Sequence, residues 1–100
     1  MKRNLTMLAD FYEFTMANGY LENGMGDTIA YFDMFYRKVP DGGGYAILAG
    51  VEQLVEYLDD LHFTAEDIEY LRSKGCFCEK FLDYLANFKF CCDVWCIAEG

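Results

Sequence analysis

The sequence predicts an α/β chain of the α+β kind, with the order helix, strand, three helices, strand. The first observation behind this prediction is that four stretches repeat apolar residues at the spacing of a helix. The second is a run of aromatic and β-branched residues at 28–37, and the third is a shorter run of the same kind at 92–98. With 100 residues and no internal repeat or linker, the chain is expected to form one domain, residues 1–100.

The first helix is expected from about Met7 to Glu22. Asn4 or Thr6 would cap its start, and the glycines of "NGMGD" would end it. Its apolar stripe consists of residues three or four positions apart. These are Leu8, Phe11, Tyr12, Met16 and Tyr20, with Met7, Phe14 and Leu21 at the margins.

Residues 28–37, "TIAYFDMFYR", are expected to form the first strand. Side chains alternate between the faces of a strand, and both faces here are largely apolar, so the strand is expected to be covered on both sides. One face has Ala30, Phe32, Met34 and Tyr36, and the other has Ile29, Tyr31, Asp33, Phe35 and Arg37.

A turn and a second helix follow this strand. In "VPDGGG", residues 39–44, the proline fixes φ and Asp-Gly favours a reversal of the chain. The next stretch repeats apolar residues at i, i+3, i+4 and i+7, with acidic residues between them, which predicts an amphipathic helix. The apolar positions are Val51, Leu54, Val55, Leu58 and Leu61.

Two more helices and a strand complete the prediction. Thr64 and Asp67 resemble a capping box, which starts a third helix that stops at Gly75. Apolar spacing predicts a fourth helix at 79–88, and "CDVWCIA" at 92–98 predicts the second strand.

Composition restricts the partners. Eight Lys and Arg against 17 Asp and Glu give a net charge of −9, which disfavours nucleic acid and anionic membrane surfaces. The hydrophobic fraction of 54% and the aromatic fraction of 18% predict apolar surface that more chain or a second subunit covers. Acidic residues interrupt the N-terminal apolar run and no stretch has the length of a membrane span, so a cytoplasmic location is expected.

The five cysteines are expected to be reduced thiols, because their number is odd and no secretion signal precedes them. Their spacings, C-x-C and C-C-x3-C, differ from the C-x2-C pairs of zinc sites, so no metal site is predicted. His62 is the only histidine and is expected in a loop or at a helix end.

The candidate binding residues each allow two interpretations. Gly42–Gly44 either serve a turn or present backbone N–H groups to an anion, although they lack the lysine of a P-loop and the spacing of a dinucleotide site. Arg37, which is followed by Lys38, either grips a phosphate or pairs with Asp33. Tyr12 either belongs to the core or offers a flat face to an aromatic ligand. The local pattern alone favours the turn, the ion pair and the core.

Two motifs taken together carry a more specific signal. They are Asp-x-Tyr-x-x-Thr-Met at Asp10–Met16 and Phe-x-Arg-Lys-x-Pro-x-Gly-Gly-Gly at Phe35–Gly44. With "EDIEYLRSKGCF" and "FLDYLANFKF" behind them, nearly the whole chain resembles the N-terminal region of nicotinate phosphoribosyltransferases, in order and with similar spacing.

This resemblance implies an enzyme that joins nicotinate to 5-phosphoribosyl 1-diphosphate, giving nicotinate mononucleotide and diphosphate in NAD salvage. ATP hydrolysis would be coupled to the reaction, so ATP and Mg²⁺ are expected for the full-length enzyme and none for this chain alone. The implied fold is a type II phosphoribosyltransferase whose α/β barrel is absent from this chain. The implied assembly is a homodimer in which the N-terminal domain of one subunit closes the active site of the other.

The resemblance also implies roles for individual residues. Tyr12 corresponds to a tyrosine that stacks on the nicotinate ring, and Arg37 to an arginine that reaches the phosphates of the phosphoribosyl substrate. Lys38 and Gly42–Gly44 would shape the rim of that site, and Asp10 would position the first helix or neighbouring groups. No catalytic residue is assigned within the chain.

Departures from the family pattern leave alternatives open. The histidine that the family phosphorylates lies downstream of this region, and His62 does not correspond to it. Asp41 stands where many relatives have an aromatic residue, and the clustered cysteines are unusual for the family. The chain is expected to be an N-terminal piece that is inactive alone. The alternatives are a non-catalytic interaction domain, or the equivalent domain of an enzyme acting on nicotinamide or quinolinate.

Overall fold

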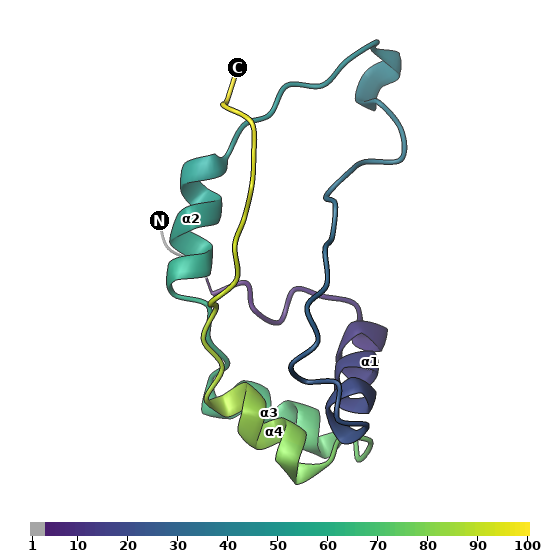
Figure 1. The fold of residues 1–100 in the computed structure, drawn as a ribbon, viewed down its shortest axis with the longest axis vertical. Coiled ribbons are helices and arrows are strands. Elements are labelled where there is room, and N and C mark those ends of the chain that lie inside the picture. The colour runs from purple at the N-terminus through teal and green to yellow at the C-terminus, as the bar shows by residue number, and fades with distance from the viewer. Residues whose placement is uncertain (1–3) are drawn as a thin grey trace.

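The computed structural model describes residues 4–100 and contains four α-helices. In Figure 1, three of them gather at one end of the molecule, one stands apart, and long extended stretches join them. No helix of this described region combines the length and apolar character that crossing a lipid bilayer requires. The elements are α1 (Phe11–Glu22), the 3₁₀ turn η1 (Pro40–Gly42), α2 (Val51–Asp59), α3 (Ala65–Ser73) and α4 (Glu79–Ala86).

The hydrophobic core lies between α3 and α4, with α1 packed against it. Its members recur at the helical spacing that predicted these two helices, and that part of the prediction is confirmed. Aromatic rings extend the core outward, since Phe77 stacks on Phe81 with ring centroids 5.7 Å apart. The buried core residues are Ile68, Leu71, Phe81, Leu82 and Leu85.

A single buried side chain, Asn18, joins α1 to the beginning of α4. The Oδ1 atom of Asn18 accepts hydrogen bonds from the backbone N–H of Cys78 at 3.1 Å and from its thiol at 3.3 Å. Cys78 is the N-cap residue of α4 and makes no capping bond with its own side chain. Asn18 therefore gives a partner to a backbone donor where α4 begins.

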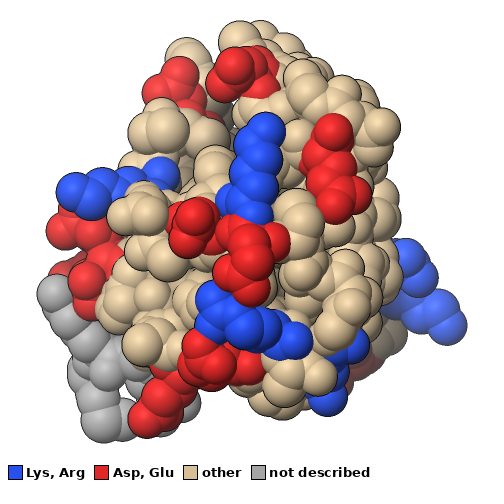
Figure 2. Space-filling view, turned by 90° about the horizontal axis from the view of Figure 1, so that it is seen from below, with Lys and Arg blue, Asp and Glu red and all other residues tan. Residues whose placement is uncertain are grey.

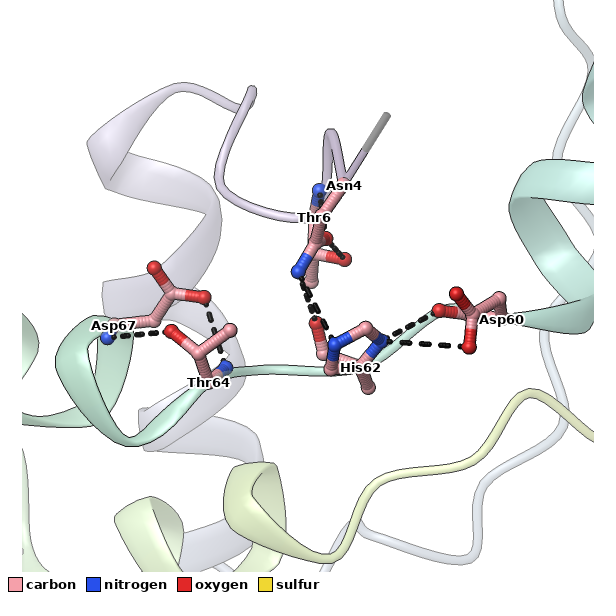
Figure 3. Close-up of polar contacts among 6 residues, drawn as sticks. All are labelled: Asn4, Thr6, Asp60, His62, Thr64 and Asp67. Atoms are coloured by element: carbon pink, nitrogen blue, oxygen red, sulfur yellow. Dashed lines mark hydrogen bonds and ion pairs between the residues drawn. The ribbon is translucent and has the colours of Figure 1, made fainter. Parts of the chain in front are cut away.

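The start of α3 confirms the predicted capping box. The Thr64 hydroxyl oxygen accepts from the backbone N–H of Asp67 at 3.1 Å, and the Asp67 carboxylate accepts from the N–H of Thr64 at 2.9 Å (Figure 3). Two backbone donors that the helix leaves without partners are thereby satisfied. At the other end, Gly75 adopts a φ of 73°, the left-handed conformation that commonly follows a helix.

The beginning of α1 differs from the prediction. The helix starts at Phe11, with Asp10 at the N-cap, rather than near Met7. Asn4 Oδ1 instead accepts from the backbone N–H and the hydroxyl of Thr6, at 3.1 and 2.6 Å (Figure 3). This local turn satisfies the side chains that were expected to cap the helix, so the chain remains non-helical there.

The N-terminal turn is also attached to the connection between α2 and α3. The amide nitrogen of Asn4 donates to the carbonyl oxygen of His62 at 3.3 Å. His62 lies in that connection, as predicted, and its Nδ1 is 2.7 Å from the carbonyl oxygen of Asp60 (Figure 3). These contacts hold residues 4–6 against the middle of the chain.

The two predicted strands are wrong. Residues 28–37 and 92–98 are extended, but within residues 4–100 no strand is formed. A strand requires backbone hydrogen bonds to a neighbour, and neither segment has such a neighbour among the described residues. Their aromatic side chains lie in solvent, with Tyr31 96% and Trp95 93% exposed. The composition indicated an extended backbone correctly, whereas pairing depends on a partner that composition does not reveal.

Helix α2 packs against none of the other described helices, and it has no buried residue. Its apolar side instead faces an open hollow of about 730 Å³, whose lining includes Val55 and Leu58 from α2 and Phe90 and Val94 from the C-terminal stretch. The Glu99 carboxylate also accepts from the backbone N–H of Val51 at 2.6 Å. A negative charge at a helix N-terminus is favourable, so Glu99 ties the C-terminal stretch to α2.

The end of the molecule formed by the helices has a mixed charge. Figure 2 shows Lys and Arg interspersed with Asp and Glu on this face, without a single-sign patch. Arg72 of α3 bonds both oxygens of Glu79 of α4, at 2.9 and 3.0 Å, and also pairs with Glu69. The hydrogen bond from Arg72 lowers the pKa of the Glu79 carboxyl and in turn raises the pKa of Arg72. This ion pair fastens α3 to α4 outside the core.

Candidate functional site

Tyr12 lies on the outer side of α1. The side of α1 that packs on the core has Phe14, Ala17 and Leu21, together with the buried Asn18. Tyr12 is 59% exposed, which rules out the core interpretation of its ring within this chain. The predicted stripe is therefore divided between two faces of α1, and the second face is exposed along Tyr12, Met16 and Tyr20.

Arg37 and Lys38 lie in an exposed bend that follows the extended stretch 28–36. The alternative in which Arg37 pairs with Asp33 is not supported, because the ion pairs found between residues 4 and 100 do not include either side chain. Residues four apart on an extended backbone are separated by about 13 Å, too far for such a pair to form easily. The guanidinium group of Arg37 is therefore not engaged by Asp33.

The glycine segment forms an exposed turn next to Arg37 and Lys38. The backbone N–H of Gly43 donates to the carbonyl oxygen of Pro40 at 3.1 Å, which closes η1. Asp41 and Gly42 both adopt positive φ, 58° and 65°. Aspartate tolerates the left-handed region better than an aromatic residue does, so Asp41 suits this turn. The turn is confirmed, and an anion site at Gly42–Gly44 stays a prediction.

Asp10 occupies the N-cap position of α1 and makes no side-chain capping bond. It lines a shallow, open hollow of about 340 Å³ together with Leu8, Ala9 and Glu13. Two carboxylates in this hollow make it unsuitable for an anionic ligand on its own. The predicted positioning role of Asp10 remains a prediction.

The structure brings the predicted site residues into two groups. Arg37, Lys38 and Gly42–Gly44 belong to one connection near η1, whereas Asp10 and Tyr12 lie at the start of α1. In Figure 1, α1 lies with α3 and α4 at one end of the molecule and η1 lies at the opposite end. None of the hollows described within residues 4–100 is lined by residues of both groups. Additional polypeptide would therefore have to complete each group.

Residues that sequence reasoning did not select line a hollow between the extended stretches. Its volume is about 540 Å³, and it is bordered by parts of 32–36, 46–49 and 95–97. Trp95 is the most prominent side chain there. The only signal in the sequence was the excess of aromatic residues, which indicates exposed apolar surface without giving its place.

The donor groups of this chain do not fit the ATP and Mg²⁺ that the resemblance implies. Within residues 4–100, no three His, Cys, Asp or Glu side chains lie together in a way that could hold a metal ion. Gly42–Gly44 are followed by Tyr45 and lack the lysine with which a P-loop reaches phosphates.

The cysteines do not form a site in the structure. All five are free thiols, and only Cys78, at the start of α4, is partly buried. Cys91, Cys92 and Cys96 lie along the exposed C-terminal stretch. Alternation along extended backbone turns neighbouring side chains to opposite sides, which separates Cys91 from Cys92.

Comparison with known proteins identifies the chain's relatives. Residues 7–100 match the family described as the nicotinate phosphoribosyltransferase (NAPRTase) N-terminal domain. The chain is 42% identical over 94 residues to nicotinate phosphoribosyltransferase pncB2 of Mycobacterium tuberculosis (strain CDC 1551 / Oshkosh), which covers 94% of the chain and 20% of that protein. It is 39% identical over 97 residues to nicotinate phosphoribosyltransferase 1 of Arabidopsis thaliana, covering 94% of the chain and 17% of the relative.

The nicotinate phosphoribosyltransferase of Bacillus subtilis (strain 168) is 35% identical over 79 residues, with 79% of the chain and 16% of the relative covered. The chain thus spans a fifth or less of the length of these relatives. Since the family match takes in almost all of the sequence, this chain belongs to the nicotinate phosphoribosyltransferase N-terminal domain family.

Proposed function

We propose that this chain is the N-terminal part of a nicotinate phosphoribosyltransferase, and that it contributes Tyr12 and Arg37 to an active site completed by other polypeptide. The reaction would join nicotinate to 5-phosphoribosyl 1-diphosphate, coupled to ATP hydrolysis, in a cytoplasmic homodimer of type II fold. The relatives bearing this name support the substrate nicotinate. ATP, Mg²⁺ and most of the phosphate contacts would belong to the polypeptide outside these residues.

The observation that carries the proposal is the exposure of the two motif side chains. Tyr12 and Arg37 each lie in one of the two motifs on which the resemblance to the family rests, and neither belongs to the chain's own core. An exposed aromatic face suits a flat pyridine ring, and a guanidinium without an ion-pair partner suits phosphate oxygens.

The function is tested by assaying the full-length protein with nicotinate, 5-phosphoribosyl 1-diphosphate and ATP. We expect nicotinate mononucleotide and diphosphate from the full-length protein and no product from the isolated 100-residue chain, because the hollows described within residues 4–100 are open. Nicotinamide and quinolinate serve as the alternative acceptors. Preference for either of them, or turnover by the isolated chain, would contradict the proposal.

The stacking role of Tyr12 is tested by two substitutions in the full-length enzyme. We expect Tyr12→Ala to raise the KM for nicotinate roughly tenfold, since an aromatic contact with its buried area contributes about 1–2 kcal/mol. Tyr12→Phe keeps the ring and should change KM by less than about twofold. The matched control is Tyr70→Ala, because Tyr70 is an exposed tyrosine on α3 outside both motifs. Equal effects of Tyr12→Ala and Tyr12→Phe would show that stacking is not what Tyr12 provides.

A further inference from the structure

Three extended stretches of this chain have backbone groups without backbone partners. They cover residues 29–39, 44–49 and 89–98, and the backbone hydrogen bonds found in the described chain involve no N–H or C=O group of these stretches. Extended backbone with free donors and acceptors is the state of an unpaired strand edge. Such an edge pairs readily with another extended polypeptide.

The same stretches border one hollow, to which they contribute mainly apolar side chains. Phe32, Met34 and Tyr36 come from the first stretch, Ile47 from the second and Trp95 from the third, around a volume of about 540 Å³. In Figure 1 the stretch 28–37 and the stretch 92–98 run in the same direction, with 44–49 passing across their far end. A segment lying between two such stretches in the opposite direction would form antiparallel ladders with both, which is the commoner kind of pairing.

The chain is also far more open than a self-sufficient domain. Its radius of gyration is 16.1 Å, whereas a compact chain of this length has about 13 Å. Its accessible surface is 8674 Å², against about 5,800 Å² for a compact folded protein of this size. The excess is more than three times the roughly 800 Å² that each partner buries in a standard protein–protein contact. An ordinary dimer contact would therefore leave most of this surface exposed.

We propose that residues 29–37 and 93–98 are two strands of a sheet whose missing central strand is an extended, alternately apolar segment of the full-length polypeptide. The matched region is a fifth or less of the relatives' length, so the polypeptide that would supply such a segment is present in proteins of this kind. Its apolar side chains fill the hollow beside Phe32 and Trp95. Its backbone pairs with the N–H and C=O groups at the facing edge of each of the two stretches. The pairing is independent of the reaction proposed above.

Hydrogen exchange followed by mass spectrometry tests this pairing. In the full-length protein we expect about every second amide of residues 31–36 and 94–97, those that face the inserted strand, to exchange at least about a hundredfold more slowly than in an unstructured chain, because paired strand amides are protected. In the isolated 100-residue chain the same amides should exchange without protection. The amides of residues 82–85 in α4 are the internal reference, since their protection does not depend on the missing strand.

A set of proline variants separates backbone pairing from simple burial. Successive N–H groups of a strand point to opposite edges, so either Met34→Pro or Phe35→Pro must remove a hydrogen bond to the inserted strand. In the full-length protein, at least one of them should speed exchange at residues 94–97 tenfold or more beyond its control, Met34→Ala or Phe35→Ala.

Three results would overturn the proposal. One is the absence of protection at residues 31–36 and 94–97 in the full-length protein. Another is full protection of these amides in the isolated chain at concentrations where it self-associates, which would make a second copy the occupant. The third is exchange at residues 94–97 that is the same in both proline variants as in their alanine controls. That result would mean that the stretches are buried but not paired with a strand.

Discussion

Phe81→Ala is expected to lower the free energy of unfolding of this chain by about 3–5 kcal/mol. The side chain is 1% exposed, stacks on Phe77 and lies in the core beside Leu71 and Leu82. Removing a buried ring loses its transfer free energy and leaves a cavity that neighbouring side chains fill only in part. Domains of this size have about 5–15 kcal/mol in total, and this core is small, so the variant is expected to be largely unfolded at ambient temperature.

Urea unfolding followed by far-ultraviolet circular dichroism measures this loss. The matched control is Phe32→Ala, which removes the same ring from a position that is 92% exposed. We expect that control to change the free energy of unfolding by no more than about 0.5 kcal/mol. A loss in Phe32→Ala comparable to that in Phe81→Ala would mean that the extended stretch packs within the isolated chain, contrary to the structure.

The helices could be predicted from the sequence because their signals are local. Spacing of apolar residues and the Thr64–Asp67 capping box depend on residues within one or two turns of each other. The apolar spacing was confirmed in α3 and α4, and the capping box at the start of α3. The helix ends were less certain, as Asn4 and Thr6 show, because a side chain that can cap a helix can equally bond within its own turn.

The strands could not be predicted in the same way, because a strand is defined by a partner. The stretch at 28–37 has the composition of a strand covered on both faces, yet within this chain Phe32 and Tyr31 lie in solvent. The composition of this stretch therefore indicates burial on both faces, which the 100 residues do not provide. The same reason explains why the buried Asn18–Cys78 contact was missed, since its two residues are 60 positions apart.

For the candidate site, the sequence indicated which residues belong to the two motifs. The structure showed whether their side chains are exposed and whether they are paired within the chain. The core interpretation of Tyr12 and the ion-pair interpretation of Arg37 were the commoner expectations from local pattern, and the structure supports neither. The motifs provided information that periodicity lacks, because they record which residues occur together rather than which face they occupy.

The second large effect is expected from Arg37→Met in the full-length enzyme, which should raise the KM for 5-phosphoribosyl 1-diphosphate about 10- to 100-fold. Hydrogen bonds to a charged group contribute about 1.5–3 kcal/mol, and about 1.4 kcal/mol corresponds to a factor of ten in affinity. The KM for nicotinate should change little, since the guanidinium would touch phosphate and not the pyridine ring. Thermal stability should also be unchanged, because Arg37 has no ion pair with Asp33 to lose.

Arg72→Met is the matched control, because it makes the same substitution at an arginine that the chain does use. Arg72 bonds Glu79 through two nitrogens and also pairs with Glu69, so its loss should lower the melting temperature while leaving both KM values unchanged. We therefore expect opposite results from the two variants. Steady-state kinetics should show a raised KM only for Arg37→Met, and thermal melts should show a lowered melting temperature only for Arg72→Met. If Arg37→Met lowered the melting temperature and left the KM for the phosphoribosyl substrate unchanged, Arg37 would be a structural residue, and the interaction-domain alternative would be favoured.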